Sequence, residues 1–158
     1  MKTLNNYFEE AEFNYLGKRT IFLDIDGTLV PDKSLNFDNA VMRQLEKLKK
    51  NNRVFLCTNS NDKIRNNQIE KMLGLLIVTH NHKKPSSKII RELGIDKENK
   101  NLLVIGDKFL TDGLFALNIG AQFIKVKRRL SGKESLIIKL INLTDNLAWQ
   151  IAKLAKII

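Results

Sequence analysis

The chain of 158 residues has the length of one ordinary domain, and its 43% hydrophobic and 28% charged residues are typical of a globular protein. The sequence has no uncharged apolar stretch of the roughly 18 residues that a membrane span needs, no secretory signal pattern, and a single cysteine, which excludes an internal disulfide. The formal net charge of +10 predicts attraction to an anionic partner without identifying it.

Short apolar runs alternate with longer segments of helical periodicity. The runs predicted as strands are 20–25, 53–58, 75–79, 101–106 and 121–126. The segments predicted as helices are 37–50, 62–73, 85–93, 109–118 and 134–158. This alternation predicts an α/β fold, a Rossmann-like doubly wound parallel sheet. We expect residues 1–158 to form one domain, with an N-terminal extension at 1–19.

The C-terminal segment 134–158 has apolar residues at the spacing of an amphipathic helix. On a helical wheel the stripe consists of Leu136, Leu140, Leu143, Leu147, Ile151, Leu154 and Ile158. We expect the stripe to pack on the sheet, with Trp149 and the basic run 125–133 facing anionic lipid. The alternative is a helix that lies in the bilayer interface.

Polar side chains follow three of the predicted strands, and one more precedes a predicted helix. They are Asp24 and Asp26 at the end of the first run, Thr58 and Asn59 at the end of the second, Lys84 before segment 85–93, and Asp107 and Asp112 after the fourth run. Because the carboxyl ends of parallel strands meet at one edge of a sheet, we expect these residues to share a pocket.

These residue types are suited to phosphate chemistry. A carboxylate that attacks a phosphate ester meets like charge, so the site needs a divalent cation and a fixed positive charge. Asp24 and Asp107 are hard oxygen ligands of the kind that Mg²⁺ prefers, and Lys84 can supply the fixed charge. We expect the Thr58 hydroxyl and nearby backbone N–H groups to hold the phosphate oxygens.

The motifs that carry these residues resemble those of the haloacid dehalogenase (HAD) superfamily of phosphatases. They read Asp-Ile-Asp-Gly-Thr-Leu at 24–29, Thr-Asn at 58–59, Lys-Lys-Pro at 83–85 and Gly-Asp-Lys-Phe-Leu-Thr-Asp at 106–112. The resemblance spans residues 22–126 and implies the HAD fold and a phosphatase that works through a phospho-aspartyl intermediate.

The resemblance also implies a role for each motif residue. Asp24 is the expected nucleophile, Asp26 the general acid and base, and Lys84 the catalytic cation. Thr58, Asn59 and Lys84 are the expected substrate-binding residues. The expected ligands of the Mg²⁺ cofactor are Asp24, Asp107, the backbone carbonyl of Asp26, and Asp112, which acts through water or by orienting Lys84.

The lengths between the motifs indicate the kind of substrate. Segments 30–52 and 60–83 are too short for the cap domain of related enzymes, so we expect a capless, open site that suits a bulky or surface-bound phosphate. Within the capless group the chain is most similar to the phosphatidylglycerophosphate phosphatase branch, through segments 22–30, 83–85 and 106–121. Gly27, where that branch usually has Asn, and Thr58, where it usually has Ser, depart from its pattern.

The expected partners are a phosphomonoester substrate and anionic phospholipid. The basic run Lys125, Lys127, Arg128, Arg129 and Lys133 can attract an anionic bilayer or follow a nucleic acid backbone. No aromatic residue is interleaved with it, so nucleic acid is not expected. The alternatives are a phosphatase of polynucleotides or other soluble phosphates, and a non-catalytic phosphate-binding module. We expect a cytoplasmic protein in peripheral contact with the inner face of a membrane.

Overall fold

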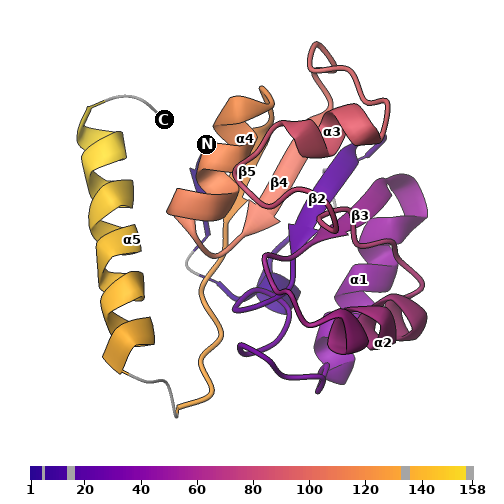
Figure 1. The fold of residues 1–158 in the computed structure, drawn as a ribbon, viewed down its shortest axis with the longest axis horizontal. Coiled ribbons are helices and arrows are strands. Elements are labelled where there is room, and N and C mark those ends of the chain that lie inside the picture. Colours follow the sequence, from indigo (N-terminus) through magenta and orange to yellow (C-terminus); the bar gives the residue numbers. More distant parts are fainter. Residues whose placement is uncertain (5, 14–16, 133–135, 156–158) are drawn as a thin grey trace.

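The computed structural model describes the chain except residues 5, 14–16, 133–135 and 156–158 (Figure 1). Its strands are β1 (Lys2–Thr3), β2 (Thr20–Asp24), β3 (Arg53–Cys57), β4 (Leu102–Gly106) and β5 (Gln122–Lys125). Its helices are α1 (Asn39–Asn51), α2 (Lys63–Leu73), α3 (Lys88–Glu92), α4 (Leu114–Asn118) and α5 (Leu136–Leu154). A 3₁₀ turn, η1 (Phe8–Glu10), and a π-helical turn, η2 (Phe109–Gly113), complete the order.

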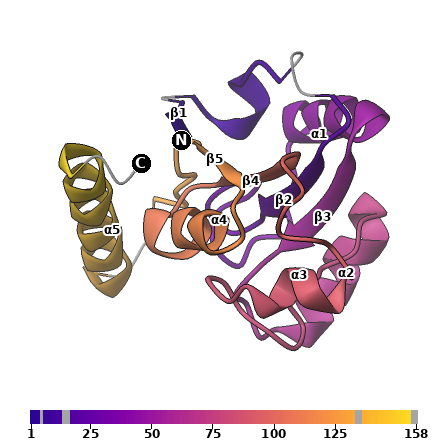
Figure 2. The same cartoon turned by 90° about the horizontal axis from the view of Figure 1, so that it is seen from above.

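The strands form one parallel sheet in the order β1-β5-β4-β2-β3. Alternate side chains point to opposite faces, so Ile21 and Leu23 join one apolar cluster with η1, α1 and α2. Phe22 joins a second cluster with α3, α4 and α5. Figure 2 shows α1 on one side of the sheet and α3 and α4 on the other. These two layers confirm the α/β, Rossmann-like doubly wound fold that the sequence predicts.

The ends of α2 illustrate how local sequence sets an element. The Asp62 carboxylate accepts a hydrogen bond from the Arg65 backbone N–H at 3.0 Å, which caps the first turn. Gly74 follows the last turn with φ of 61°, a left-handed conformation that ends the helix at little steric cost. The connection between the Thr58–Asn59 segment and Lys84 contains helix α2 and the segment 75–83 that follows it.

One strand prediction was wrong, and one short strand was not predicted. Segment 75–79 forms no strand, only an isolated parallel bridge between Leu56 and Ile77. The backbone pairing with β3 does not extend to Thr79. There the side-chain hydroxyl, and not a backbone N–H, donates to the Thr58 carbonyl, at 2.5 Å. Conversely, β1 pairs with β5 inside the segment expected to be an extension, and two residues are too short to give a periodic signal.

The prediction for α5 was also wrong, because the helix presents the opposite face to the core. Trp149 is 4% exposed and packs against Phe109 and Phe123, whereas the leucine stripe points to solvent. The described stripe residues are between 54% and 84% exposed: Leu136, Leu140, Leu143, Leu147, Ile151 and Leu154. Ile158 lies outside the described residues. Among the described helices, none is long and apolar enough to cross a membrane.

Candidate active site

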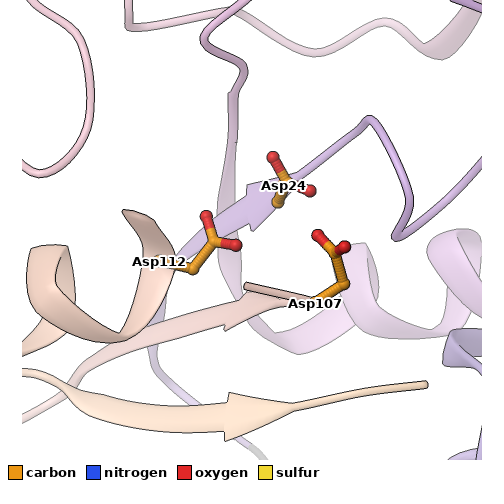
Figure 3. A group of neighbouring side chains, drawn as sticks. All are labelled: Asp24, Asp107 and Asp112. Carbon is orange, nitrogen blue, oxygen red and sulfur yellow. The ribbon is translucent and has the colours of Figure 1, made fainter. Parts of the chain in front are cut away.

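Three carboxylates converge at the carboxyl ends of the strands. Asp24 ends β2, Asp107 follows β4 and Asp112 lies in η2, and one oxygen of each lies within 4.8 Å of the others. All three side chains are buried and point into one space (Figure 3). Gly106 makes this approach feasible, because a Cβ there would lie 2.4 Å from the Asp112 carboxyl group. The parallel sheet thus brings together groups that lie far apart in the sequence.

Two cations lie against this triad of carboxylates. The Lys84 ammonium donates to Asp24 and to Asp112, at 2.5 Å each, and is itself buried. Although burial disfavours an ammonium, the carboxylates of Asp112 and Asp24 raise the pKa of Lys84 well above its usual range. Lys84 therefore stays charged at all physiological pH values. The second cation, Arg128, donates to Asp107 and, at 2.6 Å, to Asp32.

The triad of carboxylates has more negative charge than Lys84 and Arg128 offset. Burial, together with the charges of Asp24 and Asp112, raises the pKa of Asp107 to about 7. Burial and the Asp24 charge also raise the pKa of Asp112 to about 6, against the opposing effect of Lys84. The three carboxylates repel one another when all of them are ionised, and a divalent cation would relieve this repulsion. Because they are hard oxygen donors that converge on one point, they suit an ion such as Mg²⁺.

Asp26 has a different environment from the triad. Its carboxylate forms an ion pair with Arg65 at 2.8 Å and accepts hydrogen bonds from the Thr58 hydroxyl at 2.8 Å and the Lys33 N–H at 3.1 Å. Burial alone would raise the pKa of Asp26, but Arg65, with help from Thr58 and Lys33, lowers it. Sequence reasoning missed Arg65, which is 4% exposed, because a lone arginine in a helix resembles a solvated surface residue.

The second and third motifs are tied to each other. Asn59 donates to the backbone carbonyl of Lys84, and the Lys84 N–H donates back to the Asn59 side chain, both at 2.9 Å. Thr58 is fixed by its N–H, which donates to Thr79 at 3.0 Å. Asn59 is thus engaged in placing Lys84. The side chain of the neighbouring Lys83 instead donates to the Ser60 carbonyl.

Helix α5 supports the fourth motif through a buried carboxylate. Asp145 accepts the N–H groups of Phe109 and Leu110, at 3.0 and 2.8 Å, and so holds the start of η2. Lys125 pairs with Asp145 at 2.8 Å and also donates to the Asp107 carbonyl. These contacts place Asp145 and Trp149 inward, and they explain why the leucine stripe faces outward.

The predicted residues line a cavity of about 420 Å³. Its lining includes six of them: Asp24, Asp26, Thr58, Asn59, Lys84 and Asp107. Asp112 lies beside it and contacts Lys84. Lys108, Ser131 and Ile138 also line the cavity, so its wall extends to the first turns of α5. Sequence reasoning did not place α5 at the site.

One comparison with known proteins gave a match. The family model described as mitochondrial PGP phosphatase matches residues 2–131, which is most of the chain and includes every predicted site residue. A search of curated proteins found none that matches. Helix α5 lies outside the matched segment.

Proposed function

The chain belongs to the mitochondrial PGP phosphatase family, and on this premise we propose that it is a capless, HAD-type phosphatase that removes the terminal phosphate of phosphatidylglycerophosphate. The convergence of Asp24, Asp107 and Asp112 on Lys84, inside the matched segment, carries this proposal. We further propose that residues 1–158 act as one phosphatase domain.

The proposed reaction has two steps on one aspartate. A carboxylate oxygen of Asp24, oriented by Lys84 and by the Thr28 hydroxyl at 2.8 Å, attacks the phosphorus. The bond from phosphorus to the leaving alkoxide breaks, and Asp26 gives that alkoxide its proton. Asp26 then takes a proton from the water that attacks the phosphorus of the aspartyl phosphate. The bond from phosphorus to the Asp24 oxygen breaks, which restores the Asp24 carboxylate and releases inorganic phosphate.

The donor set fits Mg²⁺, and we propose that Asp24, Asp107, Asp112 and the backbone carbonyl of Asp26 hold it. Bound there, the ion would offset the charge of the phosphate oxygens. Lys84 supplies a fixed charge beside the nucleophile, and the Thr58 hydroxyl is placed to bind a phosphate oxygen once it releases Asp26. Asn59 contributes by holding the backbone of Lys84.

Short connections between the motifs support an open site. The connection between β2 and β3 contains α1, and the connection between Asn59 and Lys84 contains α2 and an isolated bridge, without a cap-sized insertion. An open mouth admits a phosphate that is presented on a membrane, which favours a lipid over a small sugar phosphate. A soluble or polynucleotide phosphatase is the second candidate, favoured by the net charge of +10.

We test the function by phosphate release from the purified chain. The substrates are phosphatidylglycerophosphate in mixed micelles, a sugar phosphate and a 3′-phosphorylated oligonucleotide. We expect the lipid to give the highest kcat/KM, and we expect chelation of Mg²⁺ to stop release until the ion is restored. A preference for the oligonucleotide by about tenfold, equivalent to 1.4 kcal/mol, would instead favour the second candidate. No release from any substrate would favour a phosphate-binding module.

We also propose that the exposed leucine face of α5 contacts an anionic bilayer. This leucine face consists of Leu136, Leu140, Leu143, Leu147, Ile151 and Leu154. Lys139 lies beside it on the helix, and the only acidic residue of α5, Asp145, is buried. Apolar residues that have a lysine beside them and no exposed acidic residue on the same helix complement anionic lipid, whereas a second copy of the chain would bring like charges together.

Vesicle sedimentation tests the leucine face. Leu140→Asn/Leu147→Asn is expected to lower partitioning onto anionic vesicles more than tenfold, because two apolar side chains lose burial worth about 1.5–3 kcal/mol each. Ile64→Asn, on the exposed side of α2, is the matched control and should bind as the wild type does. Equal binding of the double variant would contradict the assignment, and a concentration-dependent dimer that the double variant abolishes would identify a second copy as the occupant.

The family description names mitochondria, whereas the sequence predicts a cytoplasmic location. In either compartment, we propose that the protein acts at the membrane face that carries its substrate. Fractionation of cells that express the full chain would separate the two locations.

A further inference from the structure

A second cavity adjoins the proposed active site. It has a volume of about 550 Å³ and lies between α5 and the segment that continues from β5. Asp107 and Lys108 line this cavity and the catalytic pocket alike, so the two spaces meet at the fourth motif. We call the second cavity the α5 groove.

The α5 groove is lined by more cations than acids. Its basic residues are Lys108, Lys125, Lys127, Arg128 and Lys153, and its acidic residues are Asp107 and Asp145. Arg128 donates to Asp107, and Lys125 pairs with Asp145, which also accepts two backbone N–H groups. Each of the two carboxylates thus already has a cationic partner within the fold.

The remaining three lysines form no ion pair within the described part of the chain. Lys127 lies over the ring of Tyr7 at 4.6 Å, and Lys153 lies over the ring of Trp149 at 5.1 Å. The face of an aromatic ring attracts an ammonium group without occupying its N–H donors in strong hydrogen bonds. Lys127 and Lys153 are thus held near the groove with donors left for an anion, and Lys108 lies where the groove meets the catalytic pocket.

We propose that the α5 groove binds a phosphodiester, the second phosphate of a substrate whose terminal phosphate occupies the catalytic pocket. This inference rests on the proposed function, which gives the substrate as phosphatidylglycerophosphate. The headgroup of that lipid has two phosphates joined by one glycerol. The phosphodiester has one negative charge and two free oxygens, which Lys127 and Lys153 can contact by charge-assisted hydrogen bonds. The groove thereby favours a substrate in which the glycerol phosphate is linked to a phosphodiester. A small sugar phosphate lacks this second group.

Two soluble substrates separate this inference from membrane binding. Glycerol 3-phosphate has the terminal phosphate alone, and deacylated phosphatidylglycerophosphate has both phosphates but no acyl chains. We expect the wild-type chain with Mg²⁺ to have a kcat/KM about tenfold or more higher for the deacylated compound than for glycerol 3-phosphate. The difference should arise mainly from a lower KM, because only the deacylated compound has the phosphodiester that forms the charge-assisted contacts. Lys127→Ala/Lys153→Ala should remove this preference and leave glycerol 3-phosphate turnover unchanged.

Lys139→Ala is the matched control, because Lys139 is an exposed lysine of α5 that does not line the groove. Equal kcat/KM for the two substrates in the wild type, or a parallel loss on both substrates in the double variant, would overturn the groove assignment. A binding titration with glycerophosphoglycerol, which has only the phosphodiester, gives a readout independent of turnover. Binding that the double variant loses supports the groove even if phosphatase activity is absent, and no binding to the wild type overturns it.

Discussion

Asp24→Asn is expected to abolish phosphate release and to leave the fold nearly intact. An amide cannot attack phosphorus, so turnover should fall by about 10⁴-fold or more, as for removal of other nucleophiles. The fold should persist because the amide oxygen still accepts a hydrogen bond from Lys84, which keeps its second partner, Asp112. Replacing one charge also relieves repulsion on Asp107 and Asp112. The measurements are phosphate release with Mg²⁺ and thermal unfolding followed by circular dichroism.

Asp96→Asn is the matched control for this experiment. Asp96 is exposed and lies outside the catalytic pocket, and its side chain accepts a local hydrogen bond from the Glu98 N–H. This variant should release phosphate as the wild type does. Wild-type activity in Asp24→Asn would show that the phospho-aspartyl mechanism is wrong. If Asp24→Asn unfolds, Asp24→Glu takes its place, because it keeps the charge but displaces the attacking oxygen.

The triad of carboxylates could be anticipated because its position follows from topology. Buried strands appear as short runs of branched and aromatic residues, and parallel strands must end at the same edge of a sheet. Once β2 and β4 are recognised, Asp24 and Asp107 are expected at the same edge. Their direct adjacency comes from the pairing of β2 with β4, which the sequence does not give. The lysine follows from its place before Pro85 and from the charge that a phosphate site requires.

The partners of these residues could not be anticipated from sequence, because they depend on long-range packing. Arg65 lies 39 positions after Asp26, and Arg128 lies 21 positions after Asp107. Nothing in the spacing of either arginine distinguishes it from a solvated surface charge. Only the folded sheet and the packing of α2 bring Arg65 to Asp26, and the segment after β5 brings Arg128 to Asp107.

The orientation of α5 shows a second limit of sequence patterns. Periodicity identifies an apolar stripe but does not say which side of the helix the protein covers. Here the choice depends on Asp145, whose bonds to two N–H groups of η2 and to Lys125 fix the inward face. Trp149 lies one turn further along the same face and completes the packing against Phe109.

Asp26→Asn is expected to lower turnover by about 10²- to 10⁴-fold, because both proton transfers lose their carboxylate. The amide can still accept hydrogen bonds from Thr58 and Arg65, so the pocket should keep its shape. A substrate with a good leaving group, such as an aryl phosphate, needs little protonation of its oxygen. The loss on that substrate should be smaller in the step that forms the aspartyl phosphate, which burst kinetics can measure.

Arg65 provides the companion test, because it pairs with Asp26 and does not itself line the catalytic pocket. Its charge lowers the pKa of Asp26, so removing it in Arg65→Met should raise that pKa and extend the proton-donating form to higher pH. The basic limb of the kcat/KM profile that reports this proton should therefore move to higher pH, and Arg65→Lys, which keeps the charge, should restore the wild-type position. Asp26→Asn should lack the limb in either background. A basic limb that stays in place in Arg65→Met would assign the proton donor to another group, and the pH profile would then be compared with variants of Asp107, whose pKa is raised to about 7.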